Sequence, residues 1–265
     1  MKIMNADAKT AGWQFWVDRG GTFTDLVCKA PDGALTTHKL LSENPERYAD
    51  AAVQGVREVL GLTSGEAIPA GAVSVVKMGT TVATNALLER KGDRCVFVTT
   101  RGFADVLRIG YQNRPRLFDL HIELPDMLYE TVVEVDERVG PQGEVMTALD
   151  EAGARAGLQA AYDDGIRACA VVFMHGYRFP DHEARVAGIA HEIGFTQVSV
   201  SHEVSPLMKI VSRGDTTVVD AYLSPILRRY VDQVAGELDD GTRLMFMQSS
   251  GGLTDAGLFQ GKDAI

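Results

Sequence analysis

The sequence predicts an α/β protein, in which helices cover the faces of a sheet and a second α/β subdomain follows. Short apolar segments alternate with segments whose apolar residues recur at helical spacing. Several expected strands, such as residues 94–99 and 168–175, are apolar along their whole length, as strands covered on both faces are. The alternation resumes after a loop-like stretch at residues 112–130, and this second run predicts the second subdomain.

Local signals place each element. A hairpin is expected where an apolar strand at residues 15–17 ends before two glycines and a second apolar run begins. A helix opens after residue 42 and ends at Gly61, and a long helix at residues 214–238 is interrupted or kinked at Pro225. The other strands are expected at residues 34–41, 72–78, 94–99, 128–139, 168–175, 197–204 and 243–248. The other helices are expected at 82–90, 149–164 and 181–193, with a short helix that follows a turn at 101–103 and ends at residue 109.

The composition describes an ordinary globular protein of one large domain or two modest ones. The chain has 265 residues, of which 45% are hydrophobic and 23% charged. It has no apolar run long enough for a membrane span and no signal-peptide pattern at its start, so we expect no membrane contact. Cys28, Cys95 and Cys169 lie far apart in apolar runs, which favours buried reduced thiols and a cytoplasmic location. The net charge of −10 argues against a nucleic-acid partner.

The bend of the first hairpin, in the segment FWVDRGGTFTDLV, carries an unusual set of residues: Asp18, Gly20, Gly21, Thr22, Thr24 and Asp25. Glycines allow a ligand to approach the backbone closely, and their N–H groups and the threonine hydroxyls can face phosphate oxygens. Carboxylates suit Mg²⁺, usually through water. An ordinary hairpin turn with glycine at the bend explains the same residues equally well.

A second candidate site lies at the joint between a strand and a helix, in Gly79, Thr80 and Thr81. Free N–H groups and hydroxyls at such a joint can bind an anion. The alternative is that Thr80 or Thr81 merely caps the helix, and the spacing alone favours it. Asn85 faces the same end one turn later, or lies in solvent.

A third candidate is the segment TTRGFADVLRIGYQNRPRLFDL, which carries Arg101, Arg108, Arg114 and Arg116 in an otherwise acidic chain. The guanidinium group matches a carboxylate in two parallel hydrogen bonds. Loops after strand ends are where α/β folds bind ligands. A solvated basic face is the alternative, but we expect one of the four to meet a substrate carboxylate, Arg101 or Arg114 before the others.

The motif DxGGTxTD after an apolar strand resembles the first phosphate motif of the actin-like ATPase superfamily. Its form DRGGTFTD resembles the ATP-dependent hydantoinase/5-oxoprolinase family, as do LLSENPERYADA, KMGTTVATNALLERKGD, LYETVVEVDERV and LMFMQSSGGL. The resemblance implies a ribonuclease-H-like (actin-like ATPase) half with a hairpin phosphate loop, in which three strands, a helix, a strand, a helix and a strand (94–99) follow one another. It divides the chain into a tail (1–14), the hydantoinase/oxoprolinase N-terminal region (15–205) and an incomplete hydantoinase A domain (206–265).

The resemblance also implies a reaction. Members of the family open a cyclic amide, 5-oxo-L-proline or a hydantoin, with ATP and water, which suggests a role in glutathione metabolism. Asp18 and Asp25 then hold Mg²⁺ or its water as the catalytic residues. ATP phosphates are expected against Gly20, Gly21, Thr22, Thr24, Gly79, Thr80 and Thr81, and the substrate against Arg101, Arg114 and Asn85.

Relatives carry a second phosphate motif and an adenosine-binding segment, whereas this chain carries one phosphate motif. We therefore expect the N-terminal part of a longer enzyme, which alone binds ATP weakly and turns over nothing. A hydantoinase-B-type subunit or a C-terminal half is the expected partner, and a homodimer is the alternative assembly. Other interpretations are an N-methylhydantoinase, an acetone- or acetophenone-carboxylase-type ATPase subunit, and a non-catalytic assembly module. The histidines show no metal-binding spacing.

Overall fold

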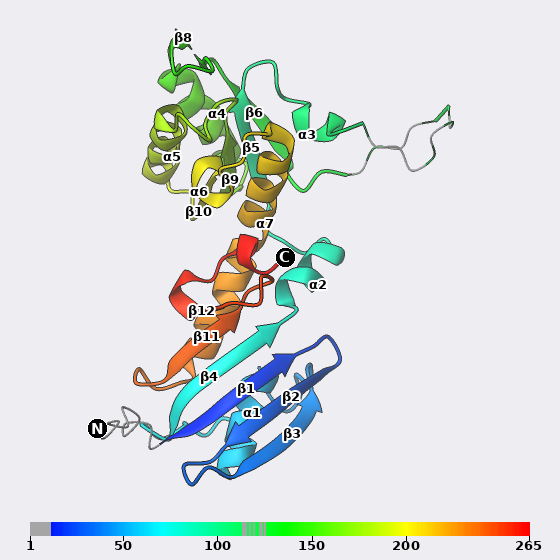
Figure 1. The fold of residues 1–265 in the computed structure, drawn as a ribbon, viewed down its shortest axis with the longest axis vertical. Helices are drawn as coiled ribbons and strands as arrows, with labels where there is room; N and C mark the ends of the chain where they lie inside the picture. The colour runs from blue at the N-terminus through cyan, green and yellow to red at the C-terminus, as the bar shows by residue number, and fades with distance from the viewer. Residues whose placement is uncertain (1–11, 113–115, 117, 119, 122–123, 125) are drawn as a thin grey trace, which may run out of the picture. The chain divides into compact units, whose positions relative to one another are not determined.

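The computed structural model describes residues 12–112, 116, 118, 120–121, 124 and 126–265. They form two compact units (Figure 1). The first unit combines Met1–Glu89 with Leu227–Ile265, and the second is Arg90–Ile226. The first unit is therefore built from two segments that are far apart in the sequence.

The first unit contains a six-stranded sheet. Its strand order is β12-β11-β4-β1-β2-β3. The strands are β1 (Trp13–Arg19), β2 (Phe23–Lys29), β3 (Leu35–Leu41), β4 (Val73–Thr80), β11 (Arg243–Met247) and β12 (Leu253–Asp255). The first three are antiparallel neighbours, as the hairpin pattern predicts, and β4 and β11 continue the sheet in parallel with β1.

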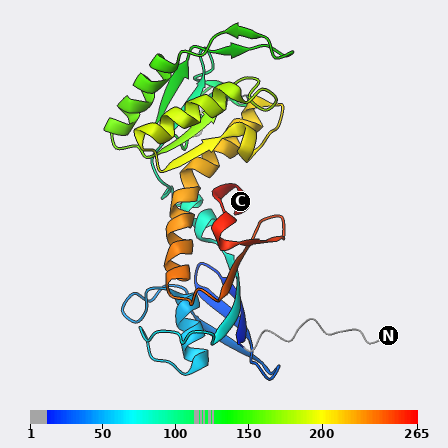
Figure 2. The same ribbon diagram turned by 90° about the vertical axis from the view of Figure 1, so that its left-hand side faces the viewer.

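Alternation along the strands separates the two faces of this sheet. In β2, Thr24, Leu26 and Cys28 are buried, whereas Asp25 and Val27 are exposed. Side chains on successive strand residues point to opposite faces, so one row of β2 belongs to the core and the other row does not. Helix α1 (Ala51–Leu60) lies against the core face (Figure 2).

Both ends of α1 have identifiable causes. The Asp50 carboxylate accepts a hydrogen bond from the Val53 N–H at 3.0 Å, which caps the first turn. Gly61 adopts the left-handed conformation with φ of 74°, and the helix ends there as its glycine predicts. The close approach of α1 to the sheet requires Gly55, because a Cβ at this position would lie 2.7 Å from a Leu26 methyl group. The first unit also contains the short helix α2 (Val82–Leu88).

The second unit contains a parallel sheet of order β10-β9-β5-β6. Its strands are β5 (Cys95–Thr100), β6 (Thr131–Val135), β9 (Ala168–Val172) and β10 (Gln197–Val200), and its helices include α3 (Val106–Ile109), α4 (Glu151–Asp163), α5 (Asp181–Ile193) and α6 (Ser201–Val204). Every residue of β5 and β9 is buried, which confirms that their apolar runs indicate central strands. A separate hairpin pairs β7 (Arg138–Val139) with β8 (Val145–Thr147).

The structure corrects several expected elements. The fifth strand of the first sheet is β11, whereas residues 94–99, expected in that place, belong to β5 of the second unit. Residues 128–139 divide between β6 and β7 instead of forming one strand. The strand expected at 197–204 ends at Val200, because Ser201 and His202 turn to donate hydrogen bonds to the Glu183 carboxylate.

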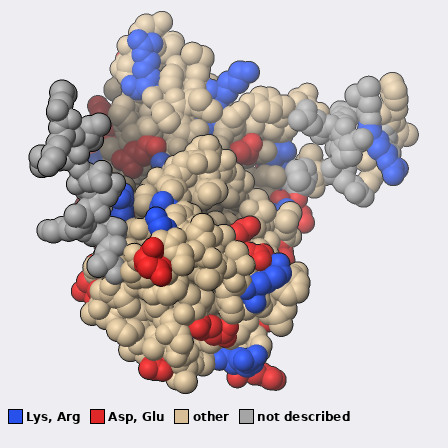
Figure 3. Space-filling view, turned by 60° about the horizontal axis from the view of Figure 1, so that its bottom comes forward, with Lys and Arg blue, Asp and Glu red and all other residues tan. Residues whose placement is uncertain are grey.

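Helix α7 (Ile210–Gly236) has 27 residues and contributes to both units. It continues through Pro225, so of the two expectations an interruption is excluded, and a kink stays a prediction. Within the residues described, no helix combines the length and apolar character that a membrane crossing requires. On the face drawn in Figure 3, acidic and basic side chains are interspersed rather than gathered by sign, as on an ordinary solvated surface.

Candidate nucleotide-phosphate site

The hairpin between β1 and β2 is closed by the Gly20 N–H, which donates to the Phe23 carbonyl at 3.1 Å. Ser42, just after β3, fixes the bend from the side. Its hydroxyl donates to the Gly20 carbonyl at 2.6 Å, and its N–H donates to the Thr22 carbonyl at 2.9 Å. The bend is thus held through its carbonyl groups, while Gly21 and Thr22 are exposed.

Thr24 does not share this exposure. Its side chain is fully buried on the core face, and its hydroxyl lies 3.0 Å from the Ser42 hydroxyl. The expectation that Thr24 lines the phosphates is therefore corrected: strand alternation turns its side chain away from the surface that carries Asp25.

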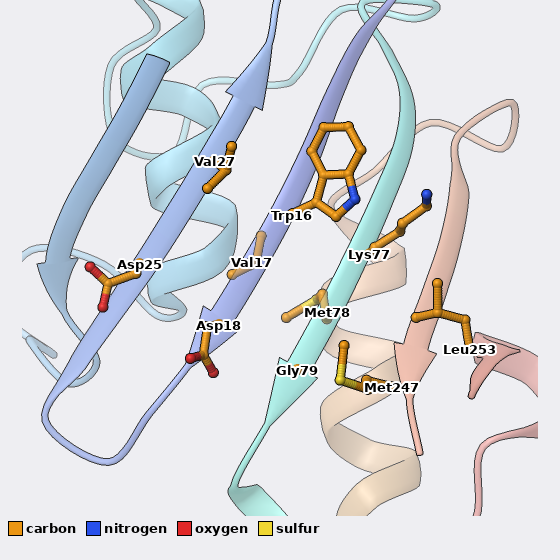
Figure 4. Close-up of a pocket in the computed structure, with 10 residues that line it drawn as sticks. All are labelled: Trp16, Val17, Asp18, Asp25, Val27, Lys77, Met78, Gly79, Met247 and Leu253. Carbon is orange, nitrogen blue, oxygen red and sulfur yellow. The ribbon is translucent and has the colours of Figure 1, made fainter. Parts of the chain in front are cut away.

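The two carboxylates of the motif lie side by side. Asp18 and Asp25 are partners in the register of β1 and β2, and both are exposed on the face opposite the core (Figure 4). Lys39 donates to both oxygens of Asp25, at 2.9 and 3.0 Å. Among the described residues, no hydrogen bond or ion pair engages the Asp18 carboxylate. Like charges opposite each other repel, so a cation beside Asp18 would relieve the repulsion that Lys39 relieves at Asp25.

These residues fit Mg²⁺ in part. Within the described ranges, no group of three or more His, Cys, Asp or Glu side chains is arranged to hold a metal ion. Mg²⁺ commonly takes one or two carboxylates and completes its shell with water and phosphate oxygens. Asp18 can supply one such ligand, whereas Asp25 would first have to release Lys39.

A hollow of about 550 Å³ adjoins the two carboxylates on the same face of the sheet (Figure 4). Its walls are mainly apolar and include Trp16, Val27 and Met247. Lys77 also lines it, with the ammonium group 5.2 Å from the centre of the Trp16 ring. Gly79 lies at the carboxylate end, where a Cβ would come within 3.5 Å of an Asp18 oxygen. A glycine at this position leaves the Asp18 carboxylate accessible.

The joint between β4 and α2 is tied to the hairpin. Thr81 donates to the Arg19 carbonyl through both its N–H and its hydroxyl, each at 3.3 Å. The Thr80 hydroxyl accepts a hydrogen bond from the Val82 N–H at 3.2 Å. Both threonine hydroxyls therefore serve local contacts, which favours the capping interpretation of Thr80 over a direct role in anion binding.

Asn85 lies beside the hairpin. Its side-chain nitrogen is 3.4 Å from the Thr81 hydroxyl, and a Cβ built on Gly21 would be 3.7 Å from that same nitrogen. The structure thus brings Asn85 together with the predicted phosphate-binding residues, within one unit. This placement agrees with the expectation that Asn85 faces the same end as Gly79, Thr80 and Thr81, and its predicted contact with the substrate stays a prediction.

The arginine-rich segment belongs to the second unit. Arg101 forms a two-pronged ion pair with Asp136, with Nη2 2.9 Å from Oδ2, and hydrogen bonding to this carboxylate raises the pKa of Arg101. A substrate carboxylate would have to displace Asp136. Arg114 lies outside the described residues. Sequence reasoning also missed Ser42 and Lys39, whose contacts with the hairpin have no local sequence signal.

Polar groups in the core of the second unit satisfy one another. The buried Glu183 carboxylate accepts hydrogen bonds from the Phe173 N–H at 2.8 Å, the Ser201 hydroxyl at 2.6 Å and the His202 N–H at 3.0 Å. His202 Nδ1 lies 2.7 Å from the same carboxylate, and this contact raises the pKa of His202. The fully buried Arg213 donates to the Ser201 hydroxyl and to backbone carbonyls. These groups stabilise the unit.

Comparison with known families assigns the chain. The model described as "Hydantoinase/oxoprolinase N-terminal region" matches residues 14–194, and the model "Hydantoinase/oxoprolinase" matches residues 213–265. The chain belongs to the hydantoinase/oxoprolinase family. The resemblance of the DRGGTFTD hairpin is thereby confirmed.

Several curated members of this family are similar to the chain. It is 42% identical to the 5-oxoprolinase of Saccharomyces cerevisiae, a match that covers 94% of this chain and 22% of the relative. It is also 42% identical to 5-oxoprolinase 1 of Arabidopsis thaliana, over 95% of this chain and 22% of the relative. The alpha subunit of caprolactamase from Pseudomonas jessenii is 31% identical, over 91% and 36% of the two chains. The chain thus spans about a fifth of the length of the 5-oxoprolinases.

Two solved structures share the fold. The ATP-dependent caprolactamase from Pseudomonas jessenii is similar with a TM-score of 0.79 and 29% identity, over 95% of this chain and 38% of that one. A nucleotide-free acetone carboxylase is similar with a TM-score of 0.74 and 22% identity, over 94% and 37%, which shows the fold alone. The α/β fold of actin-like ATPase type predicted from the sequence is confirmed.

Proposed function

We propose that this chain carries part of the nucleotide site of an ATP-dependent cyclic-amide hydrolase that opens 5-oxo-L-proline to L-glutamate. One observation carries the proposal. The Asp18 carboxylate is exposed and unpaired among the described residues, and it stands next to a glycine bend in a chain 42% identical to 5-oxoprolinases. A free carboxylate beside accessible backbone N–H groups suits the magnesium complex of a nucleotide.

The reaction requires ATP because the amide of the ring is resonance-stabilised and a poor electrophile. In the proposed sequence, the γ-phosphoryl group moves to the carbonyl oxygen of the ring. Water then adds at the carbonyl carbon, and the C–N bond of this adduct breaks as the ring nitrogen takes up a proton, which leaves an acyl phosphate. A second water hydrolyses the acyl phosphate to the carboxylate and inorganic phosphate. The protein mainly positions these groups and neutralises phosphate charge. Bound Mg²⁺ would supply part of that neutralisation, with Asp18 as its main protein ligand.

Each residue near the hairpin receives a role. The N–H groups of Gly21 and Thr22 and the Asn85 amide face the phosphates, and Asp25 supports Asp18 from the neighbouring strand. Gly20 forms the bend, Gly79 leaves room for Asp18, and Thr80 and Thr81 hold the joint that carries Asn85.

Several finer assignments belong to the same proposal. Arg101 and Arg114 recognise the carboxylate of the substrate. The proposal also includes a family boundary near residue 205 and a partner, which is a hydantoinase-B-type subunit or a further C-terminal part. It includes a cytoplasmic location and a role in glutathione metabolism. The caprolactamase relative is named as a subunit alpha, which supports a second subunit as the partner.

One observation favours a second candidate function. Arg101 already pairs with Asp136, so its guanidinium group is not free to bind a substrate carboxylate. An uncharged lactam such as caprolactam, the substrate named for the caprolactamase relative, would need no such group.

Phosphate release by the intact protein, with its partner subunit if it has one, separates these functions. We expect release to be stimulated most by 5-oxo-L-proline and to be accompanied by an equal amount of L-glutamate. If caprolactam, N-methylhydantoin or acetone stimulates phosphate release most, the substrate is that compound's class and not 5-oxo-L-proline. The absence of both turnover and Mg-ATP binding would favour a non-catalytic assembly module. The 265-residue chain alone is expected to bind Mg-ATP weakly and to release no phosphate.

A further inference from the structure

Arg19 lies inside the DRGGT motif, between the metal carboxylate Asp18 and the first glycine of the bend. An arginine at such a position is usually interpreted as a phosphate contact, because its guanidinium binds phosphate oxygens in pairs. The geometry around Arg19 points to a different role.

The Arg19 side chain points to the core face of the sheet. In β1, Phe15 and Val17 are buried and Asp18 is exposed, so alternation places Arg19 on the same side as Phe15 and Val17. Its side chain is only 16% exposed, and Nε lies 3.7 Å from an Asp50 oxygen. The guanidinium carbon is 5.2 Å from the centre of the Tyr230 ring. The guanidinium is thus turned towards α7 and the start of α1, away from the face that carries Asp18.

Tyr230 provides a rigid surface for this contact. It is 7% exposed and packs edge-on against Phe246 of β11, with 6.3 Å between ring centres. Burial raises its pKa, as does the charge of Asp50, so its ring carries a neutral hydroxyl. The Tyr230 hydroxyl interacts with the side chains of Asp50 and Thr80, so the ring belongs to the same cluster as the carboxylate that faces Arg19. With the guanidinium placed over the ring, the contact between Arg19 and Tyr230 is a cation–π contact.

The backbone of Arg19 connects the two segments of the candidate site. Its carbonyl accepts both hydrogen bonds from Thr81, and the Thr81 hydroxyl lies 3.4 Å from the Asn85 amide. A displacement of Arg19 would therefore move the base of the hairpin and the residue that supports Asn85 together. Asp50 completes the arrangement, because it pairs with Arg19 and caps α1 through its other oxygen.

We propose that Arg19 is a positioning residue that never touches the nucleotide. Its cation–π contact with Tyr230 and its pairing with Asp50 hold the hairpin and the β4–α2 joint in register, so that Asp18, Gly21 and Asn85 face one phosphate group. The inference rests on the proposed function and adds to it the residues that hold the phosphate site from behind.

The test is Mg-ATP affinity, measured with the 265-residue chain well below its unfolding temperature. Arg19→Lys keeps the positive charge that a phosphate contact needs but lacks the planar group that lies over the Tyr230 ring. We expect it to raise the Kd about tenfold, within what a partly buried cation–π contact contributes. Tyr230→Leu, which removes the ring, should have a similar effect. Tyr230→Phe keeps the ring and removes only the hydroxyl, so it should weaken binding less than Tyr230→Leu does.

A double-mutant cycle distinguishes positioning through the cation–π contact from independent effects. The variant carrying Arg19→Lys and Tyr230→Leu should bind no more weakly than the weaker single variant. If Tyr230→Leu does not fold, Asp50→Asn replaces it in the cycle, because asparagine caps a helix as well as aspartate but carries no charge. Asp50→Asn alone should raise the Kd about threefold.

Three outcomes overturn the inference. Wild-type affinity in Arg19→Lys would show that the cation–π contact has no role in binding, and multiplied effects in the double variant would show that the two residues act separately. A lowered unfolding temperature with unchanged Kd would leave Arg19 a merely structural role. In each case the proposed function stands if the wild type binds Mg-ATP and Asp18→Asn does not. Failure of the wild type to bind would overturn the proposed function as well.

Discussion

A carboxylate near a strand end has opposite surroundings in the two units. In the first unit, the Asp18 carboxylate stands exposed beside Gly79, and no partner among the described residues engages it. In the second unit, the Glu183 carboxylate is fully buried, and Ser201 and His202 donate to it. Arg213 donates to Ser201 in turn.

This difference separates binding from stability. A buried charge is costly unless it is paired and hydrogen-bonded, and the partners of Glu183 offset that cost in the second unit. An exposed and unpaired carboxylate such as Asp18 contributes little to the fold and remains available to a ligand. Substitutions in the first unit's hairpin should therefore change nucleotide affinity, and substitutions in the Glu183 network should change the free energy of unfolding.

The largest effect on binding is expected from Asp18→Asn. It keeps the shape of the side chain but removes the charge that would hold Mg²⁺, so we expect Mg-ATP affinity to fall about 100-fold. Isothermal titration calorimetry measures it. The matched control is Asp25→Asn. The Asp25 carboxylate already pairs with Lys39, so its removal should lower Mg-ATP affinity less. A larger loss in the Asp25 variant would reverse the roles of the two residues.

Glu183→Ala should produce the largest loss of stability. It leaves several buried donors without an acceptor, and the free energy of unfolding should fall by about 3–5 kcal/mol. Urea denaturation measures this quantity. The control is Glu192→Ala in the same helix, because Glu192 forms a half-exposed pair with Arg155 that contributes about 0–1 kcal/mol. Equal losses in the two variants would contradict the account of the buried network.

Gly21→Ala sharpens the comparison at the hairpin. A Cβ at this position meets nothing closer than the Asn85 nitrogen at 3.7 Å, so the protein should fold with unchanged stability. The added methyl group would stand where the phosphate approaches, and the Kd for Mg-ATP should rise roughly tenfold. Gly188→Ala in α5 is the control, since a Cβ there meets nothing within 4 Å and its binding should match the wild type. Unchanged binding in Gly21→Ala would place the phosphate elsewhere.

The smallest effect concerns pH. Hydrogen bonding to Glu183 raises the pKa of His202 above its ordinary value of about 6.5. The folded state therefore holds this proton more tightly than the unfolded state. The resulting stability is fully present below the unfolded pKa and is lost as the pH rises through the folded pKa. We expect a small loss of stability over this range, because the group is partly exposed. Thermal unfolding of wild type and His202→Asn between pH 6 and pH 8 measures it. An equal slope in both would exclude His202.

Much of the site follows from alternation in the sequence. Phe15 and Val17 are apolar, so Asp18 must lie on the other face of β1. The same rule predicts that Thr24 is buried with Leu26 and Cys28, and that Arg19 points inward. Both placements were available from the sequence, but the motif resemblance drew Thr24 towards the phosphates.

The rest depends on contacts between distant residues, for which a local pattern carries no signal. The pairing of β11 with β4 joins Arg243 to Val75, and nothing near residue 75 indicates this partner. The end of β10 is set by Glu183, which lies eighteen residues before Ser201. Tyr230 meets Arg19 only because α7 returns to the first unit.

The most direct test of the central claim is an amide chemical-shift titration of the 265-residue chain with Mg-ATP. The account predicts saturable shifts at the backbone amides of Gly21 and Thr22 and at the Asn85 side-chain amide, all of them absent in Asp18→Asn. Saturable shifts that leave the hairpin unchanged, or that persist in Asp18→Asn, would contradict it.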